Sequence, residues 1–421
     1  MSLDRRTFLR QASLGAAGVA VVTQLPAAEA AGALPAFDDR EPEAFWRAVR
    51  DQFPLTRQLK YFNTGGLGPA SSPVLAKVAE VTRQLQERSE HGHALHAGAR
   101  EVLARFLGAE PGEIAFVRNA TEANGIIAAG LRLAPGDEVI FETHAHPGGS
   151  FPWAQQETVR GLKLKLFDPA DTAAANLDRI AALITPRTRV VQVSHVTAPT
   201  GVVMPVDAIA RLCRERGLWF HIDGAQSAGM FPFSLREIGC DSFAASGHKW
   251  MGGPLETGVL HIRRDRLNDV APPLVGAYSG DLDFLPGELR LAPTAIRHEY
   301  GTRSAAAIVG LAEAVKFQER VGRERIAARG RALIARLRAG LAPLPGVEIL
   351  TPAGAADSAA MLTFRHAKLG YTDLFSRLMK DGAFRCRPVS EQKLNALRVS
   401  AHLFNSPAEI DGLVAAVRAV G

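Results

Sequence analysis

Residues 219–254 read WFHIDGAQSAGMFPFSLREIGCDSFAASGHKWMGGP. They contain two short apolar runs, WFHID (219–223) and SFAAS (242–246), and such runs are typical of strands buried on both faces of a sheet. The first run ends at Asp223, and the second is followed at once by a loop that contains Lys249. Because active sites of α/β sheets lie at the carboxyl ends of the strands, both side chains are candidates for one site.

The same alternation continues on either side of this segment. Helical patterns are expected at 75–107, 120–133, 175–185 and 206–216. Strands are expected at 113–119, 138–143, 163–168, 190–196, 219–223, 242–246 and 257–263. Apolar strands separated by helices predict an α/β fold with a mostly parallel, seven-stranded sheet that is covered on both faces.

A second and smaller unit is expected towards the C-terminus. Residues 304–342 have a long helical pattern, and helices are also expected near 372–381 and 407–420. Short strands are expected near 347–350, 360–366, 383–388 and 396–400. We therefore predict a signal segment (1–30), an N-terminal arm and loop (31–74), a large domain (75–303) and a small α/β domain (304–421), which the arm completes.

Composition excludes several classes of protein. The 421 residues carry a formal net charge of +6, and no dense run of Lys and Arg with interleaved aromatic residues suggests nucleic-acid binding. The three cysteines, Cys213, Cys240 and Cys386, form no CxxC pair, which disfavours a disulfide framework or a structural zinc site. No segment further along the chain is apolar and long enough for a membrane span.

The first 30 residues have the features of an export signal. DRRTFLR (4–10) is followed by an uncharged stretch from Gln11 to Ala28 and by a small-residue cleavage motif, Ala28-Glu29-Ala30. This order is typical of a twin-arginine signal, which predicts export of the folded protein to the periplasm by the twin-arginine translocase. An amphipathic helix or an uncleaved anchor is the alternative.

Asp223 and Lys249 each allow a chemical and a structural interpretation. A carboxylate at the end of a buried strand needs a partner, and a protonated pyridine nitrogen would serve; alternatively, Asp223 caps a following helix. A lysine shielded from water has a lowered pKa and can condense with an aldehyde, whereas an ordinary loop lysine is solvated. The spacing of 26 residues, one strand along, favours the chemical interpretation.

A phosphate site is predicted beside them. Strand FVRN (116–119) is followed by Ala120 and Thr121 at the start of a helix. Backbone N–H groups at a helix N-terminus bind phosphate, although simple helix capping would explain the same residues. Ser246 and His248 could donate further hydrogen bonds to the phosphate.

These motifs together resemble the class V aminotransferase fold family, which includes cysteine desulfurases and isopenicillin-N-epimerase-like proteins. The resemblance covers essentially the whole mature chain, and the segments that carry it are RNATEAN (118–124), HIDGAQSAG (221–229), SGHKWMGGP (246–254), HEYGTRS (298–304) and LRVSAHLFNS (397–406). The resemblance implies a type I fold of pyridoxal-phosphate (PLP) transferases, with PLP as cofactor, and a homodimer with shared active sites.

The resemblance also implies roles for single residues. Lys249 would form the Schiff base and move protons, Asp223 would pair with the pyridine nitrogen, and Arg398 would bind a substrate carboxylate, unless it makes a surface salt bridge. The other implied cofactor contacts are Ala120, Thr121, His146, His195, Gln226, Ser246 and His248, with Gly301 and Thr302 supplied by the neighbouring subunit. Asn63, in the loop YFNTGGLGPASSP (61–73), is expected to contact substrate.

Two departures separate the chain from the desulfurases. Desulfurases have Asn where this chain has His195, and the SHV form resembles the epimerase-like branch. Desulfurases also need a mobile cysteine near the C-terminal domain, whereas FRCRPV (384–389) is typical of a strand that packs Cys386.

Two groups of histidines raise the question of a metal site. His144 and His146 form an HxH pair, but no further ligands accompany them, so no metal is expected. His91, His93 and His96 are interpreted as helix residues near the mouth of the site, without an assigned role.

The sequence predicts an exported PLP enzyme acting on an amino acid or amino-acyl group, by transamination or a related reaction. Epimerisation, C–S lyase activity and tailoring of a pyoverdine-type siderophore are the alternatives of the same family. A non-catalytic binding protein on the same fold is the alternative of another class. A nucleotide-dependent dehydrogenase is disfavoured because no strand is followed by GxGxxG.

Overall fold

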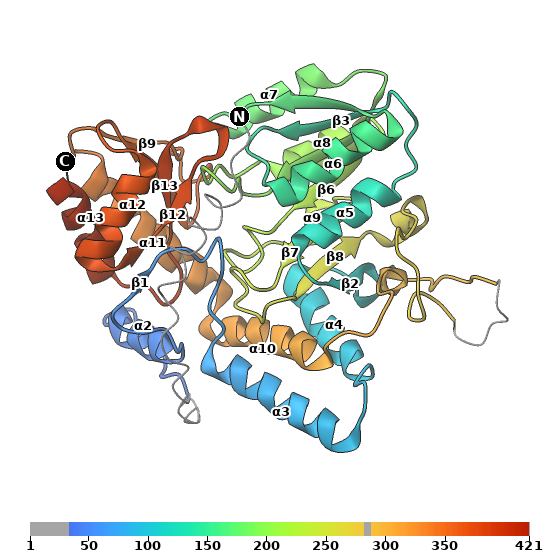
Figure 1. Ribbon diagram of the computed structural model, residues 1–421, viewed down its shortest axis with the longest axis horizontal. Helices are drawn as coiled ribbons and strands as arrows, with labels where there is room; N and C mark the ends of the chain where they lie inside the picture. Colours follow the sequence, from blue (N-terminus) through green and yellow to red (C-terminus); the bar gives the residue numbers. More distant parts are fainter. Residues whose placement is uncertain (1–32, 282–287, 421) are drawn as a thin grey trace, which may run out of the picture. The chain divides into compact units, whose positions relative to one another are not determined.

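The computed structural model describes residues 33–281 and 288–420. A seven-stranded sheet has the strand order β2-β8-β7-β6-β5-β3-β4. Its strands are β2 (Ile114–Val117), β3 (Glu138–Glu142), β4 (Lys163–Phe167), β5 (Thr188–Ser194), β6 (Trp219–Asp223), β7 (Ser242–Ser246) and β8 (Gly258–Ile262). Among these strands, β8 runs antiparallel to both of its neighbours, and the other pairs are parallel. The predicted α/β fold with a mostly parallel sheet is confirmed (Figure 1).

Helices cover both faces of this sheet because most of its strands are apolar on both sides. One core lies under α4 (Leu95–Leu107), α7 (Ala173–Leu183), α8 (Val206–Glu215), α9 (Leu235–Ile238) and α10 (Ala305–Val321). The core on the other face lies under α5 (Ala120–Gly130) and α6 (Pro147–Arg160). Burial of apolar side chains in these two cores stabilises the sheet by about 25 cal/mol for each Å² removed from water.

A second, antiparallel sheet has the order β12-β13-β10-β9. Its strands are β9 (Val347–Ile349), β10 (Met361–His366), β12 (Arg387–Val389) and β13 (Ala396–Ser400). It shares a core with α11 (Arg323–Leu341), α12 (Tyr371–Gly382) and α13 (Pro407–Val420).

The N-terminal arm joins this C-terminal unit, as expected. Its strand β1 (Lys60–Tyr61) pairs in parallel with β11 (Phe384–Arg385). Its helix α2 (Pro42–Asp51) packs aromatic side chains, among them Phe45 and Trp46, against residues of α10, α11 and the loop before α13.

Three local expectations need correction. The helical pattern at 75–107 forms two helices, α3 (Ser72–Arg88) and α4, because Ser89 and Gly92 have positive φ. The pattern at 304–342 also breaks, at Gly322, where φ is +98°. Helix α6 was not predicted, since its first turns contain Pro and Gly, which are poor helix formers.

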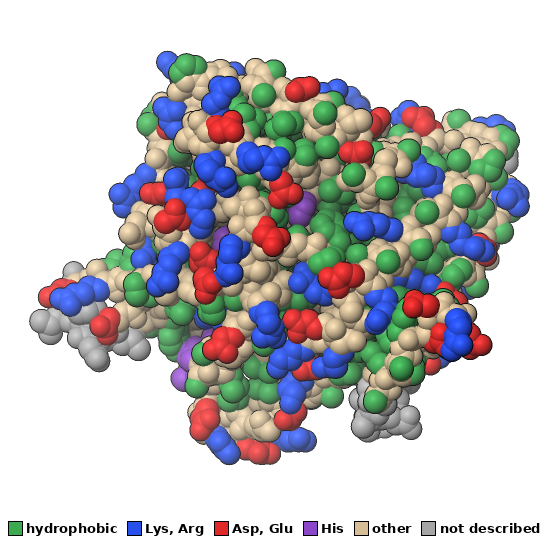
Figure 2. All heavy atoms as spheres, turned by 180° about the vertical axis from the view of Figure 1, so that it is seen from behind, with side chains coloured by type: hydrophobic (Ala, Val, Ile, Leu, Met, Phe, Trp, Pro, Cys, Tyr) green, Lys and Arg blue, Asp and Glu red, His purple; other side chains and the backbone are tan. Residues whose placement is uncertain are grey.

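The predicted domain boundaries and export signal have a different standing. The described residues pack as one compact unit that contains the seven-stranded and the four-stranded sheet, and the boundary near residue 303 stays a prediction. The expected signal at residues 1–30 lies outside the described residues. In the part of the chain that is described, no helix has both the length and the apolar character needed to cross a bilayer. Figure 2 shows Lys and Arg side chains interspersed with Asp and Glu on the face opposite to that of Figure 1.

Candidate active site

A cavity of about 270 Å³ lies at the carboxyl ends of three adjacent parallel strands. The final residues of β5, β6 and β7 all line it: Ser194, Asp223 and Ser246. Nine of the predicted site residues line this cavity: Ala120, Thr121, His146, Asp223, Gln226, Ser246, His248, Lys249 and Arg398. Four of the five matching motifs, together with His146, therefore meet at the carboxyl ends of the parallel strands, where a site is expected; HEYGTRS (298–304) does not line the cavity.

Lys249 is held by a tightly packed loop. Gly68 donates its N–H to the carbonyl of His248 (2.7 Å), and a Cβ on Gly68 would lie 1.8 Å from the carbonyl oxygen of Lys249. The neighbouring Trp250 is completely buried. Burial lowers the pKa of Lys249 to about 8, against the opposing effect of Asp223. The amine is therefore neutral in a much larger fraction of molecules near neutral pH than an exposed lysine is.

Asp223 accepts hydrogen bonds from neutral donors. Its Oδ2 accepts from Asn124 Nδ2 (2.9 Å), and its Oδ1 accepts from the N–H of Ala225 (3.0 Å). The side chain is almost buried, and among the described residues no ion-pair partner lies within 4 Å of it. A carboxylate with this surrounding can pair with a cationic group of a ligand in the cavity.

Asn124 of α5 is the last residue in a chain of hydrogen bonds between side chains of β6 and β7. Trp219 Nε1 donates to Ser242 Oγ (2.9 Å), which bonds His221 Nδ1 (2.7 Å), and His221 Nε2 bonds Asn124 Oδ1 (2.8 Å). Burial lowers the pKa of His221 to about 4, so the ring is neutral. The pattern is satisfied when Nε2 of His221 carries the proton, and this orients the amide of Asn124 with its nitrogen towards Asp223.

Pro152 in α6 contributes to the same arrangement. A proline has no N–H, so the carbonyl of Gly148, four residues earlier, has no helical partner there. That carbonyl accepts the second amide hydrogen of Asn124 (3.1 Å). The amide of Asn124 is thereby fixed from three sides, and it in turn fixes Asp223.

The predicted phosphate residues lie together at the start of α5. Asn119 caps this helix by accepting a hydrogen bond from the N–H of Glu122 (3.0 Å), and the N–H of Ala120 donates to Ser246 Oγ (3.0 Å). Thr121 lines the cavity beside them. His248 also lines the cavity, and its Nδ1 is buried and without a hydrogen-bond partner in the described structure. A phosphate would meet these donors and the positive end of the α5 dipole.

His146 and Gln226 complete the lining around Lys249. His146 caps α6, with Nδ1 accepting from the N–H of Gly148 (3.0 Å), and burial lowers its pKa. Gln226 Nε2 donates to the carbonyl of Gly65 (2.9 Å), and its Oε1 accepts from Trp250 Nε1 (2.8 Å). One amide hydrogen of Gln226 is left for a ligand, which is compatible with its predicted role as a cofactor contact.

Arg398 is buried, so the alternative of a surface salt bridge is wrong. Its side chain is 1% exposed, and burial lowers its pKa to about 9. Nη1 donates to the carbonyl of Ala198 (2.7 Å) and Nη2 to Asn63 Oδ1 (3.2 Å). A Cβ on Gly65 would lie 2.8 Å from Nη2, so only glycine allows the loop to approach this closely. A buried guanidinium without a carboxylate partner is suited to binding a carboxylate ligand.

Four predicted residues do not line the cavity. His195 is buried beside it, with its ring packed edge-on against Phe231 and Phe233, both at 5.2 Å between centroids. Asn63 positions Arg398. Gly301 and Thr302 do not line this cavity, and their role in a partner subunit's site stays a prediction.

The two histidine groups have separate environments. His144 bonds Thr200 Oγ1 (2.9 Å) and so does not join His146 in a pair of ligands. His93 packs against Tyr278 with ring centroids 4.1 Å apart, and His96 lies buried 4.0 Å from Glu299. No group of three His, Cys, Asp or Glu residues suited to a metal ion occurs within residues 33–281 and 288–420.

Three residues near the cavity were not predicted from the sequence. Asn124 lies one helical turn after Ala120, and this spacing could have identified it. Arg387 is the first residue of β12 and lines the cavity. The sequence motif FRCRPV was interpreted only for its cysteine, so Arg387 was not predicted. Glu142, at the end of β3, accepts from the N–H of Ser194 (3.0 Å), and burial raises its pKa to about 7.

The arrangement fits PLP. Lys249 offers an amine of lowered pKa, Asp223 a carboxylate for the pyridine nitrogen, and His248 an unused donor or acceptor at the phosphate end. Together with the start of α5, these groups suit the three chemically distinct parts of the cofactor, and the role of each single residue stays a prediction.

Comparison with known proteins agrees with this fit. The chain is 30% identical to isopenicillin N epimerase of Amycolatopsis lactamdurans, over 89% of this chain and 98% of that protein. A cysteine desulfurase from Thermococcus onnurineus has a structure with a TM-score of 0.83 at 26% identity, covering 91% and 99% of the two chains. The protein C-DES, in a structure with glycine linked covalently to its PLP cofactor, gives 0.80 at 28% identity, covering 88% and 98%. Residues 74–413 match the family model "Aminotransferase class-V", and the chain therefore belongs to this family.

Proposed function

We propose that this protein is an exported PLP-dependent enzyme that acts on an amino acid or amino-acyl substrate, by transamination or a related reaction. The observation that carries the proposal is one cavity holding Lys249, Asp223 and Arg398. Bound PLP supplies a ring that accepts electrons from the substrate's α-carbon. The chain supplies the groups that place the substrate beside that ring.

Each of these groups has a task that its surroundings support. Arg398 binds the α-carboxylate, because it is buried, charged and without an acidic partner. Lys249, with its pKa of about 8, takes and returns a proton at the α-carbon. Asp223, held by Asn124, keeps a positive charge on the pyridine nitrogen.

Desulfurization with a cysteine nucleophile is not supported. Cys386 is 2% exposed, and burial raises the pKa of its thiol to about 12. A thiol in this state forms little of the reactive thiolate at neutral pH. Cys213 and Cys240 are also buried, with thiol pKa values raised by burial. Epimerisation is the second candidate, because the epimerase relative covers nearly the whole chain; C–S lyase chemistry and siderophore tailoring are narrower alternatives within the same proposal.

The visible absorption spectrum tests the central assignment. Purified protein with PLP is expected to show an absorption band at roughly 410–430 nm from cofactor joined to Lys249. Borohydride should remove this band and leave the cofactor attached irreversibly to Lys249. Lys249→Ala should lack this covalent linkage. Lys163→Ala, which removes an exposed lysine on β4, should retain it. Amino donors are then screened by bleaching of the band, and release of an oxo acid, an epimer or sulfide identifies the reaction. Absence of the band from folded protein would refute the enzyme and favour a non-catalytic binding protein.

Export and assembly need separate tests. Replacing Arg5 and Arg6 by Lys should keep the protein in the cytoplasm if DRRTFLR directs twin-arginine export. Sedimentation should give a homodimer if Gly301 and Thr302 complete a partner subunit's site. Cytoplasmic retention of the unaltered chain, or a monomer that retains full activity, would contradict these parts of the proposal.

A further inference from the structure

Two arginines face the same cavity from the C-terminal sheet. Arg387 on β12 and Arg398 on β13 are directly paired across the antiparallel strands, and both line the cavity. Directly opposite residues point to the same side of a sheet, with Cβ atoms about 4.5–5.5 Å apart, and two like charges in that position repel each other. This arrangement is retained most easily where an anion lies between or beside the two guanidinium groups.

Among the described residues, Glu391 is the one acid that forms an ion pair with either arginine. Glu391 forms an ion pair with Arg387 Nη2, and although burial raises the pKa of Glu391, hydrogen bonding from Arg387 lowers it on balance. The side chains of Arg387 and Glu391 are each 22% exposed, and of the two Arg387 lines the cavity. Lys249 and Asp223 line the same cavity, but the proposed function assigns both of them to PLP. An α-carboxylate on Arg398 would therefore leave Arg387 with Glu391 as its nearest acid.

Arg387 also has an unused donor. Its Nη1 is buried and has no hydrogen-bond partner in the described structure. A guanidinium that lines the cavity, with one nitrogen paired with Glu391 and another buried without a partner, can donate to a further anionic oxygen. Glu391 holds the side chain in place meanwhile, as a carboxylate of the protein rather than of the substrate.

We propose that Arg387 binds a second carboxylate, so that the substrates are amino acids or amino-acyl groups whose side chain carries a carboxylate. The proposal rests on the proposed function, because it assigns the α-carboxylate to Arg398. It makes Arg387 a determinant of specificity. An uncharged side chain would leave Nη1 without a partner, and this discriminates against neutral amino acids.

Binding of unreactive acids tests the inference apart from catalysis. Glutarate has two carboxylates and valerate has one on a chain of the same length, and neither has an amino group that could react. Calorimetry on the PLP-loaded protein should give a Kd for glutarate that is lower than that for valerate by roughly tenfold or more. Arg387→Gln should abolish this preference and leave the Kd of valerate unchanged.

Matched variants separate a local charge effect from general damage. Arg385→Gln removes an exposed arginine two residues away, and it should retain the full preference for glutarate. Arg387→Lys keeps the charge without the planar fork, so it should retain part of the preference. Equal Kd values for glutarate and valerate in the unaltered protein would overturn the inference, as would equal weakening of both acids by Arg387→Gln. Failure of the proposed function is distinguishable, because the PLP absorption band would then be missing before any acid is added.

Discussion

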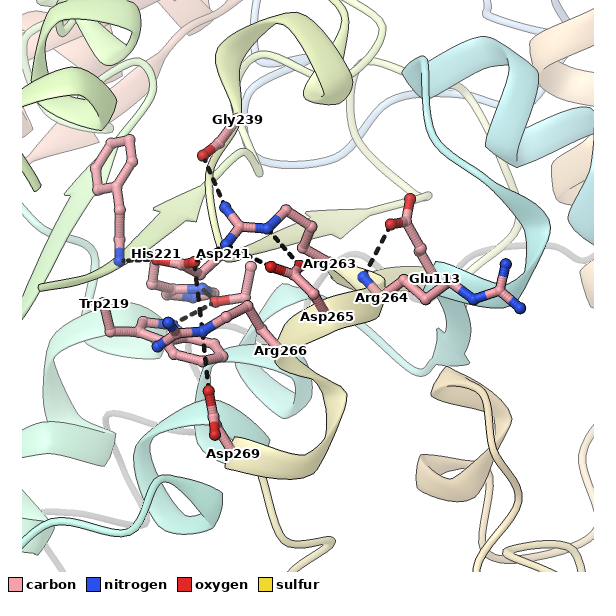
Figure 3. A network of polar contacts seen from close by, with 12 residues as sticks. Glu113, Trp219, His221, Gly239, Asp241, Arg263, Arg264, Asp265, Arg266 and Asp269 are labelled. Carbon is pink, nitrogen blue, oxygen red and sulfur yellow. Dashed lines mark hydrogen bonds and ion pairs between the residues drawn. The ribbon is translucent and has the colours of Figure 1, made fainter. Parts of the chain in front are cut away.

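Two aspartates at opposite ends of adjacent strands have opposite surroundings. Asp241 lies just before β7, at the amino end of the strands, where it accepts from the N–H of Phe220 (2.7 Å) and pairs with Arg263 (3.1 Å) and Arg266 (3.7 Å) (Figure 3). Asp223 ends β6, at the carboxyl end, and has only neutral donors. At one edge the aspartate is paired with arginines of the protein. At the other edge the aspartate has no ion-pair partner among the described residues, so it can pair with a cationic group of a ligand.

The two edges are nevertheless connected. Arg266 lies over the ring of Trp219, 5.0 Å from its centroid, and Trp219 donates to Ser242, which bonds His221. His221 then bonds Asn124. The structural edge in Figure 3 therefore supports the orientation of Asn124, and so of Asp223, from the other end of the strands.

The largest effect is expected when the ligand-directed charge is removed. Asp223→Asn keeps the shape but removes the negative charge that would stabilise a pyridinium. We expect kcat to fall by roughly 10²–10³-fold, as for the loss of a preorganised electrostatic contact, with little loss of folding stability. Steady-state kinetics and urea unfolding check the two parts. A variant that unfolded readily but kept its kcat would place Asp223 with the structural acids.

Asp241→Asn should give the reverse pattern. It leaves Arg263 and Arg266 with fewer partners and weakens the bond to Phe220, so we expect unfolding to be easier by about 1–3 kcal/mol. The kcat should fall far less than in Asp223→Asn, because Asp241 does not line the cavity and is connected to it only through Arg266 and the hydrogen-bond chain from Trp219 to Asn124. Urea unfolding beside kinetics measures this. If Asp241→Asn lowered kcat as strongly as Asp223→Asn, the division between the two edges would be refuted.

The residues at the two edges were not equally predictable from the sequence. Asp223 and Lys249 were predictable, because short apolar runs locate the strands and the strand ends locate the site. No such signal marks Asp241. Its partners Arg263 and Arg266 follow β8, and they reach Asp241 only because β8 pairs with β7. Arg387 was missed for the same reason: its importance arises from its register with Arg398, and register is a tertiary property.

Helix boundaries were also beyond the sequence pattern. Gly92 separates α3 from α4, where a Cβ would lie 2.8 Å from the Cβ of Ala305. Ala305 is more than 200 residues away in sequence, so periodicity alone could not reveal the break. Local patterns therefore predicted most of the elements, with α6 as an exception, whereas long-range contacts also decide where some of them end.

Tight packing of the backbone is the other property of the chemical edge. Gly68→Ala would place a Cβ 1.8 Å from the carbonyl oxygen of Lys249, which must move. We expect a loss of about 1–3 kcal/mol in unfolding free energy, together with weaker PLP binding. Gly98→Ala is the control, because this helical glycine in α4 has no atom within 4 Å of its would-be Cβ. It should gain about 0.5–1 kcal/mol. Equal behaviour of the two variants in thermal unfolding and PLP titration would show that the lysine loop is not tightly constrained.

The smallest effect concerns His221, the residue that joins the two edges. Its pKa is lowered to about 4 in the folded protein, from an ordinary value near 6.5, because it is buried. The unfolded chain therefore binds more protons between these values, so stability is fully present above about pH 6.5 and is lost as the pH falls towards 4. This residue should contribute a loss of ~0.5–1 kcal/mol between about pH 7 and 6. His221→Gln should lose less stability over that interval than the unaltered protein, since the other buried histidines with a pKa of about 4, such as His195 and His402, titrate equally in both. Urea unfolding at the two pH values measures the difference, and an identical pH dependence would mean that His221 is not held neutral between Ser242 and Asn124.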